Sequence, residues 1–125
     1  MNRVVIDLLA LEHNIQVVDR WMTGHGASWT LVTKVLCGHS GTLHGLRKLG
    51  IRAIGDSRLE NLEVLGGLLP GMEAWYLRLP HPRGVDAVVR LTDVSLNSEI
   101  EVIEALSAEA ARQGRRHAVI VMIEL

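Results

Sequence analysis

One lysine in this sequence stands where a side chain could do chemistry. Lys34 closes the mostly apolar run 29–33, which has the length of a buried strand. A lysine at the end of such a strand is costly to desolvate unless its amine is paired, neutralised or used covalently. Burial lowers the pKa of an amine, and the neutral amine can form a Schiff base. The alternative is a lysine whose stem carries the charge out to solvent, and the pattern alone slightly favours it.

Three other polar residues stand at or near the ends of later apolar runs, where β/α enzymes place groups that meet a ligand. Ser57 and Glu60 match a capping box, which by itself explains both residues. Arg78 is a charge within an apolar run; it meets a carboxylate or a cofactor oxygen, or it points outward. Asn97 is most simply a helix cap. The pattern therefore leaves these residues open between structure and function.

The loop after the lysine is built of small residues, Cys37-Gly38-His39-Ser40-Gly41. Such a loop lets backbone approach a ligand, but it matches no established phosphate motif. Cys37 is a possible nucleophile, although a small buried thiol is the simpler interpretation. The six histidines are scattered along the chain, so the sequence predicts no metal site.

Short apolar runs alternate with helical patterns along the whole chain. Most runs lack polar alternation, as expected of strands buried on both faces. The predicted strands are 4–6, 29–35, 51–54, 74–79, 91–94 and 118–123. One predicted helix spans the apolar stripe 11–22, and a second runs from Leu43 to a stop at Gly50. Two more begin at the capping boxes 57–60 and 98–101, and a shorter one begins after Pro82. This alternation predicts a parallel α/β sheet, either doubly wound and open or part of a (β/α)8 barrel.

Composition restricts the class of protein further. The chain has 125 residues, of which 48% are hydrophobic and 22% charged, as in a soluble globular domain. A formal charge of −1 gives no field that would attract nucleic acid or an anionic membrane. No apolar stretch approaches the ~20 residues needed to cross a bilayer, and Asp7 interrupts the first apolar run, so no secretory signal is expected. A lone cysteine fits the reducing cytoplasm, which is the expected location.

The last apolar run is followed only by Glu124-Leu125, with no turn or closing helix. Ligand sites of β/α folds form in loops after the strands. We therefore expect a truncated form of a longer enzyme, marginally stable and prone to self-association through uncovered apolar sheet.

Several motifs together resemble one known family. The opening 5–14 reads VIDLLALEHN, and at the expected distance 32–38 reads VTKVLCG. Further on, 56–62 reads DSRLENL, 76–80 reads YLRLP and 93–99 reads DVSLNSE. In this order they are similar to the alanine racemase N-terminal domain family of fold-type III pyridoxal-phosphate (PLP) enzymes. The closest branch is that of the ornithine and other amino-acid racemases.

The resemblance implies that residues 1–125 form about five of the eight strands of a PLP-binding (β/α)8 TIM-type barrel, without the family's C-terminal β-domain. It implies pyridoxal 5′-phosphate as cofactor, a Schiff base on Lys34, and Cα proton abstraction from ornithine or a similar basic amino acid. Ser57, Arg78 and Asn97 would line the cofactor pocket. Relatives are homodimers in which a tyrosine of the partner's C-terminal domain is the second acid/base, so we expect this chain alone to be inactive.

Two departures and two alternatives accompany the resemblance. Cys37-Gly38-His39 stands near the Tyr-Gly-His of alanine racemases, and Met122 stands where some of them have a lysine. Both argue against an alanine-specific site. The alternatives are a non-catalytic PLP-binding protein of the cofactor-homeostasis type and an inactive half-barrel that dimerises.

Overall fold

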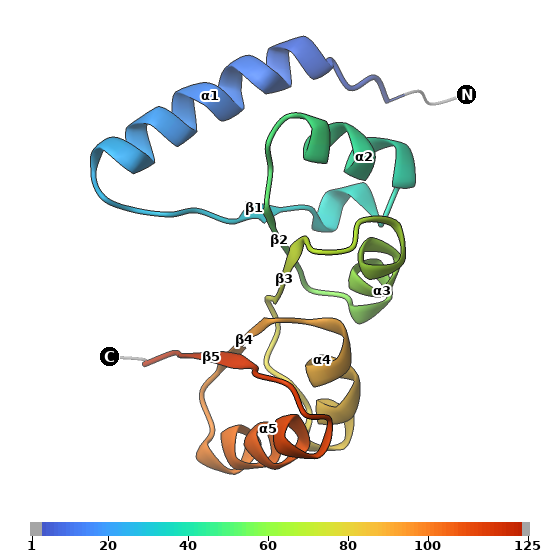
Figure 1. Cartoon of the computed structure of the whole chain (residues 1–125), viewed down its shortest axis with the longest axis vertical. Helices are drawn as coiled ribbons and strands as arrows, with labels where there is room; N and C mark the ends of the chain where they lie inside the picture. The colour runs from blue at the N-terminus through green and yellow to red at the C-terminus, as the bar shows by residue number, and fades with distance from the viewer. Residues whose placement is uncertain (1–3, 124–125) are drawn as a thin grey trace.

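The computed structural model of the chain describes residues 4–123 and shows a five-stranded parallel sheet flanked by helices (Figure 1). The strands are β1 (Leu31–Val32), β2 (Ala53–Asp56), β3 (Glu73–Tyr76), β4 (Val94–Asn97) and β5 (Ala118–Val121). The α-helices are α1 (Leu8–Gly24), α2 (Ser40–Lys48), α3 (Leu59–Leu68), α4 (Val85–Leu91) and α5 (Ile100–Arg112). Two 3-10 turns, η1 (Lys34–Leu36) and η2 (Pro82–Gly84), follow β1 and precede α4.

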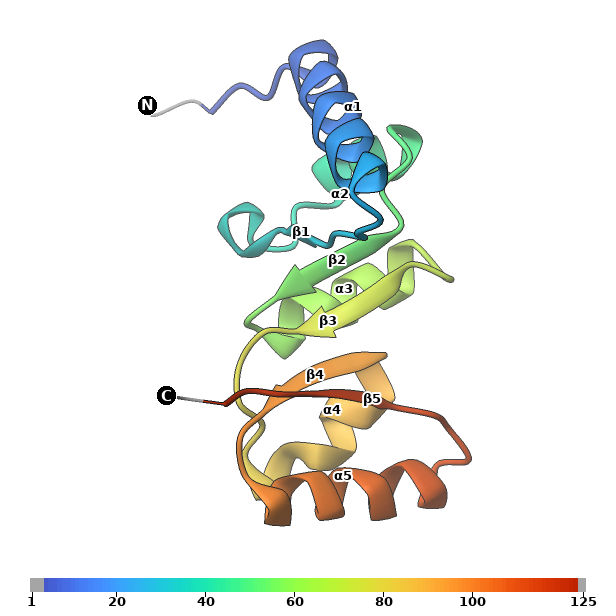
Figure 2. The same ribbon diagram turned by 90° about the vertical axis from the view of Figure 1, so that its left-hand side faces the viewer.

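The strands lie in the order β1-β2-β3-β4-β5, and every neighbouring pair is parallel. A doubly wound sheet would reverse its strand order at a switch point, whereas a (β/α)8 barrel adds strands in sequence. Figure 2 shows α2 to α5 on one face of the sheet. The α/β prediction is therefore confirmed, and the fold is like the N-terminal part of a TIM barrel.

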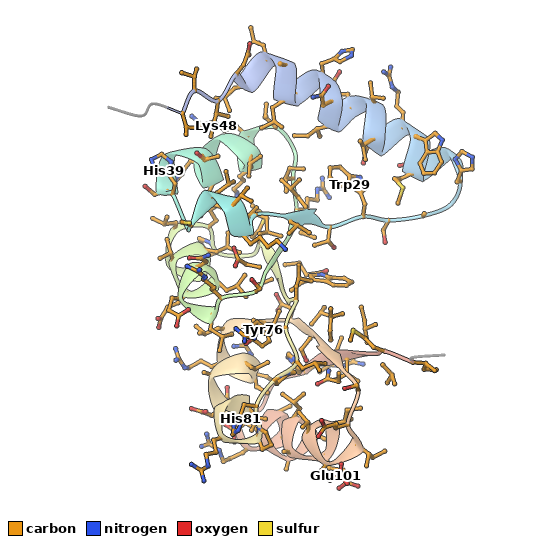
Figure 3. The ribbon with its side chains drawn as sticks, turned by 180° about the vertical axis from the view of Figure 1, so that it is seen from behind. Trp29, His39, Lys48, Tyr76, His81 and Glu101 are labelled. Carbon is orange, nitrogen blue, oxygen red and sulfur yellow. The ribbon has the colours of Figure 1, made fainter. Side chains whose placement is uncertain are left out.

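The core consists of two apolar clusters. The first contains side chains of α1, α2, α3 and the strands β2 and β3: Ile15, Leu43, Leu46, Ile51, Ile54, Leu62, Leu65, Leu69, Met72 and Ala74. The second contains side chains of α4 and α5: Val88, Val89, Val102, Leu106 and Ala110. Tyr76, labelled in Figure 3, and Leu59 are partly buried and pack against both clusters. The clusters are otherwise separate within residues 4–123, so the sheet has two halves that meet at β3 and β4.

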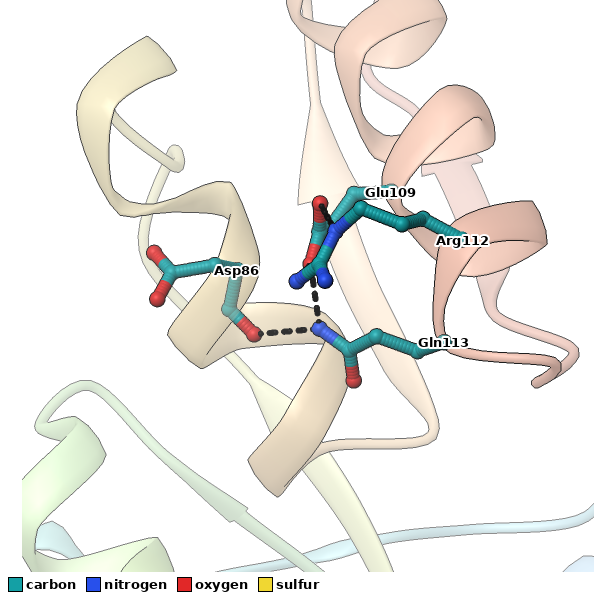
Figure 4. A network of polar contacts seen from close by, with 4 residues as sticks. All are labelled: Asp86, Glu109, Arg112 and Gln113. Atoms are coloured by element: carbon teal, nitrogen blue, oxygen red, sulfur yellow. Dashed lines mark hydrogen bonds and ion pairs between the residues drawn. The ribbon is translucent and has the colours of Figure 1, made fainter.

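A polar contact adds to the apolar packing between α4 and α5 (Figure 4). The Gln113 side chain donates to the Asp86 carbonyl oxygen over 3.0 Å and to Glu109 Oε1 over 2.6 Å. Arg112 forms an ion pair with the same Glu109 carboxylate. Gln113 thereby fixes the end of α5 against α4.

Three predicted strands differ from the observed structure. The run 91–94 shares only Val94 with β4, because Leu91 is the last residue of α4. The run 4–6 is not a strand, and Val4 is 88% exposed, because no neighbouring strand lies beside it. Asp7 instead caps α1, accepting hydrogen bonds from Leu9 N and Ala10 N. The run 29–35 forms a strand only over Leu31–Val32, after which the chain turns into η1.

Both capping boxes are wrong. The N-caps of α3 and α5 are Arg58 and Glu99, and neither helix has a side-chain cap hydrogen bond. The Asp56 carboxylate instead accepts from the N–H of the N-cap residue Arg58 at 3.0 Å, which closes the turn before the helix. The predicted stop of α2 is confirmed, since Gly50 has a φ of +88° just beyond the helix.

None of the helices within residues 4–123 is long and apolar enough to span a membrane.

All four residues of β5 are exposed, and Val121 is 56% accessible. This is the uncovered apolar sheet surface that the sequence leads us to expect; self-association through it stays a prediction.

Candidate functional site

The four candidate residues lie at one edge of the sheet. Lys34 opens η1 just after β1, Ser57 follows β2, and Arg78 lies two residues beyond β3. Asn97 is the last residue of β4. Because the strands are parallel, their carboxyl ends meet at the same edge, which is where β/α barrels build their sites. Position along the strands therefore agrees with the prediction.

Exposure separates these four residues. The side chains of Lys34 and Arg78 are exposed, Ser57 is half-buried, and Asn97 is only 1% accessible. The expectation that Lys34 closes a buried strand is wrong, because β1 ends at Val32 and the chain turns outward. Within residues 4–123, the Lys34 amine has no ion-pair partner. It is a primary amine available to a ligand.

The strand register shows which face of the sheet is free. Ile54 and Ala74 are paired across β2 and β3 and belong to the first core cluster, so they face the helices. Their successors, Gly55 and Trp75, are also paired and must point to the opposite face. A Cβ added to Gly55 would lie 2.7 Å from Leu77 Cδ1, so glycine allows Leu77 to lie across β2 on that face.

A buried carboxylate links the end of β1 to β2 and α3. Asp56, the last residue of β2, is 1% exposed. Its Oδ2 accepts from Thr33 Oγ1 at 3.4 Å, and Asn61 Nδ2 lies 3.1 Å from both carboxylate oxygens. Together with the Arg58 amide, these donors satisfy the carboxylate. Asp56 therefore ties the end of β1, 23 residues earlier in the chain, to β2 and the start of α3.

The loop that carries Lys34 is held at its two ends. Before it, Thr33 N donates to Gly55 O at 2.9 Å, and the Thr33 side chain is buried against Asp56. After it, Gly38 has a φ of +69° and lies against Asn61, whose Oδ1 is 3.4 Å from the site of an added Cβ. Asn61 thus contacts both the loop and the carboxylate.

The prediction that Cys37 is a small buried thiol is wrong. Its thiol is exposed, and the residue has a φ of +48°, which side chains rarely adopt. Its neighbour His39 caps α2, with Nδ1 accepting from Thr42 N at 3.3 Å. Among residues 4–123, no three His, Cys, Asp or Glu side chains come together as metal ligands.

Asn97 belongs to a buried polar network rather than to a helix cap. Its Nδ2 donates to Ser95 O and to Ser95 Oγ, each at 3.0 Å, and its Oδ1 has no partner within the described residues. Ser95 and His117 Nε2 are 2.8 Å apart, while His117 Nδ1 is 3.2 Å from the Thr92 carbonyl oxygen. Because a carbonyl only accepts, Nδ1 carries the proton and Nε2 accepts from Ser95. Burial lowers the pKa of His117.

Arg78 lies beside Tyr76, the residue that contacts both core clusters. Burial is the main cause that raises the pKa of the Tyr76 phenol, and the positive charge of Arg78 opposes it. The charge of Arg78 is therefore close enough to affect Tyr76, while the Arg78 side chain itself is exposed.

Sequence reasoning missed Thr33, Asp56 and Asn61 as parts of this site. The signal was present, because Asp56 and Asn61 both lie in the motif DSRLENL and Thr33 precedes the lysine. A carboxylate that ends an apolar run, with an amide five residues later, indicates a bond across a strand–helix turn. That signal was assigned to Ser57 and Glu60 instead.

Comparison with known proteins gives related matches along the chain. Residues 6–125 match the family model described as alanine racemase, N-terminal domain. Over 123 residues, the chain is 29% identical to an ornithine racemase of Acetoanaerobium sticklandii, covering 98% of this chain and 34% of that protein. The chain therefore spans about a third of the length of this curated relative.

Solved structures share the fold. PipY of Synechococcus elongatus with PLP bound superposes with a TM-score of 0.68 at 19% identity, over 77% of this chain and 46% of that one. PipY without PLP gives a TM-score of 0.63 at 18% identity, over 69% and 42% of the two chains.

Proposed function

Because the chain belongs to the alanine racemase N-terminal domain family, we propose that it supplies the cofactor lysine, Lys34, of a PLP-dependent amino-acid racemase. The observation that carries the proposal is the place of this amine. Lys34 is exposed at the carboxyl edge of a sequential parallel sheet, in a loop fixed at both ends. That edge is where (β/α)8 proteins bind their ligands.

The residues at the edge fit the aldehyde end of pyridoxal 5′-phosphate. A primary amine is the group that condenses with an aldehyde, and Lys34 has no competing ion-pair partner within residues 4–123. The PLP-bound PipY structure, which shares this fold, supports the same cofactor. Ser57 and Arg78 are candidates for further cofactor contacts because both are accessible at this edge. Asn97 would have to leave Ser95 to reach a ligand.

Bound PLP supplies an electron-withdrawing ring that stabilises negative charge at the substrate Cα. Lys34 is the residue that would hold the cofactor through its amine, and the same amine would remove or return the substrate Cα proton on its own side. Racemisation needs a second acid/base on the opposite side. From the family resemblance, we propose a tyrosine of a partner subunit for that role, in a homodimer.

We propose ornithine or a similar basic amino acid as substrate, because the curated relative matched over 98% of this chain is an ornithine racemase. A second candidate function is PLP binding without racemisation. The fold similarity to PipY with PLP bound favours it.

The chain contains only two lysines, which makes the test sharp. Lys48 ends α2 and is exposed, so it is a matched control at the far end of that helix (Figure 3). Purified chain is incubated with PLP, reduced with borohydride and mapped by mass spectrometry. We expect an absorbance band of a Schiff base and a reduced adduct on Lys34, both lost in Lys34→Ala and kept in Lys48→Ala. An adduct confined to Lys48 would refute the proposal.

A chiral assay with L- and D-ornithine separates the two candidate functions. It is run on the whole racemase, with this chain joined to the remaining domains of a relative. Racemisation that disappears in Lys34→Ala supports the racemase, whereas an adduct without racemisation supports PLP binding alone.

A further inference from the structure

The carboxylate of Asp56 is the most deeply buried acidic group at the candidate site. It is 1% exposed, and no Lys, Arg or His side chain of the described residues pairs with it. Its partners are a hydroxyl, an amide side chain and a backbone N–H. Burying a polar group costs free energy unless its hydrogen bonds are complete, and an apolar residue would fill the same space at lower cost. The carboxylate therefore calls for an explanation other than packing.

We infer that Asp56 is a positioning residue for Lys34, an inference that rests on the proposed role of that lysine. Thr33, bonded to Asp56 Oδ2, is the residue immediately before Lys34. Asn61, bonded to both carboxylate oxygens, contacts Gly38, where the lysine loop ends. One carboxylate thus bonds the residue before Lys34 directly and orients the Asn61 side chain that packs beside Gly38 at the other end of the loop.

The directional character of these bonds supports the assignment. Apolar contacts are non-directional and would allow the loop to slide, whereas each hydrogen bond to Asp56 fixes one donor in distance and angle. Within the loop, Leu36 N donates to Thr33 O at 2.8 Å and His39 N donates to Leu36 O at 2.9 Å. A shift of Thr33 therefore propagates through both amides.

Three variants test the bonds one at a time. Thr33→Val keeps the shape of a buried side chain and removes only the hydroxyl donor. Asp56→Asn replaces one acceptor oxygen by an N–H₂ group, and because Asn61 Nδ2 lies 3.1 Å from both oxygens, that group faces this donor in either orientation. The exchange Asp56→Asn with Asn61→Asp returns a donor opposite an acceptor and is the rescue variant.

Thr92→Val is the matched control. Thr92 is also a buried threonine, 1% exposed against 3% for Thr33, and its hydroxyl also makes one hydrogen bond, to Val88 O at 2.7 Å. It lies at the amino end of β4, away from the lysine loop.

The first measurement is hydrogen exchange at the Leu36 and His39 amides, which needs no cofactor. Loss of one buried hydrogen bond is expected to speed exchange about five- to tenfold in Thr33→Val and Asp56→Asn. Thr92→Val should leave both amides unchanged, and the rescue variant should return them to within about twofold of the parent chain. Unchanged exchange in Thr33→Val, or equal acceleration in Thr92→Val, would overturn the inference.

The second measurement is the rate at which borohydride traps PLP on Lys34. We expect it to fall several-fold in Thr33→Val and Asp56→Asn, to recover in the rescue variant, and to hold in Thr92→Val. A trapping rate that is equal in Thr33→Val and the parent chain overturns the positioning role. If the parent chain gives no adduct on Lys34, the proposed function fails, and the exchange measurement still decides whether Asp56 holds the loop.

Discussion

Replacing Leu106 by alanine is expected to unfold the second half of the sheet while the first half stays folded. Leu106 is 1% exposed and lies at the centre of the cluster between α4 and α5. That cluster meets the first one through Tyr76 and Leu59. The backbone pairing of β3 with β4 is also short, consisting of Trp75 with Val94 and Tyr76 with Ser95. Damage on one side should therefore stay on that side.

The magnitude follows from the size of the side chain removed. A buried Leu→Ala change costs about 3 kcal/mol or more, the lost transfer free energy plus the cavity left behind. A small unit unfolds in urea with a slope of about 1 to 1.5 kcal/mol per molar. The second half should therefore unfold at a urea concentration about 2 to 3 M lower, or without urea if its own stability is smaller than this cost.

The distribution of tryptophans supplies the assay. Trp21, Trp29 and Trp75 are the three tryptophans of the chain, and none lies in α4 or α5. Trp75 pairs with Val94 across the boundary, so the assay uses a Trp75→Phe background, in which the fluorescence of Trp21 and Trp29 reports the first half. Far-ultraviolet circular dichroism reports the helices of both halves.

In Leu106→Ala, the dichroism transition should split or move while the fluorescence midpoint stays within about 0.3 M urea of the parent value. Leu62→Ala, equally buried at 1% in the first cluster, is the control and should move the fluorescence midpoint. If both probes of Leu106→Ala moved together, the two clusters would be one cooperative unit and the reasoning would be refuted.

Three further predictions concern single contacts. Burial lowers the pKa of His117, so the neutral imidazole stabilises the fold above its ordinary pKa, and this stability is lost as the pH falls through the lowered pKa. The urea midpoint should therefore drop as the pH is lowered from 7 into the acidic range, and it should drop less in His117→Gln. Gly55→Ala should cost about 1 to 3 kcal/mol in urea unfolding, because its Cβ would meet Leu77, and adding Leu77→Ala should restore part of the loss. The hydrogen bond from Arg112 lowers the pKa of Glu109 to about 2, and carboxyl NMR should show that pKa rising toward its ordinary value in Arg112→Ala.

The architecture could be predicted from the sequence because apolar periodicity reports burial directly. Five of the six apolar runs contain or adjoin a strand, and the parallel order follows from the helices between them. The exception, 4–6, has the same composition, but a strand needs a neighbour, and residues 4–7 have none. Pairing partners are a property of the fold and are invisible in a short window.

The strand ends that carry the four candidate residues could be predicted from the sequence, but the hydrogen bonds around them could not. The pattern alone slightly favoured a solvent-exposed Lys34, and the family motifs singled it out as the cofactor lysine; its exposure depends on where β1 stops and η1 begins. Ser57 and Asn97 were assigned to helix caps by local pattern. In the structure neither residue caps a helix: Asp56 closes the turn before α3, and the Asn97 side chain donates to Ser95. Side chains with several hydrogen-bonding choices are decided by tertiary neighbours.

Stability and site geometry therefore depend on different residues in this chain. Apolar clusters on the helical side supply non-directional stabilisation, so loss of one leucine should lower the unfolding free energy without moving Lys34. The bonds of Thr33 and Asn61 to Asp56 bury little apolar area but fix directions at the carboxyl edge. Leu106→Ala should accordingly leave PLP trapping on Lys34 intact at temperatures where the first half is folded. Thr33→Val should slow trapping while lowering the urea midpoint of the first half by only about 1 M, much less than a buried Leu→Ala change. A variant set in which both quantities always fell together would mean that the lysine loop is positioned by the stability of the whole sheet and not by Asp56.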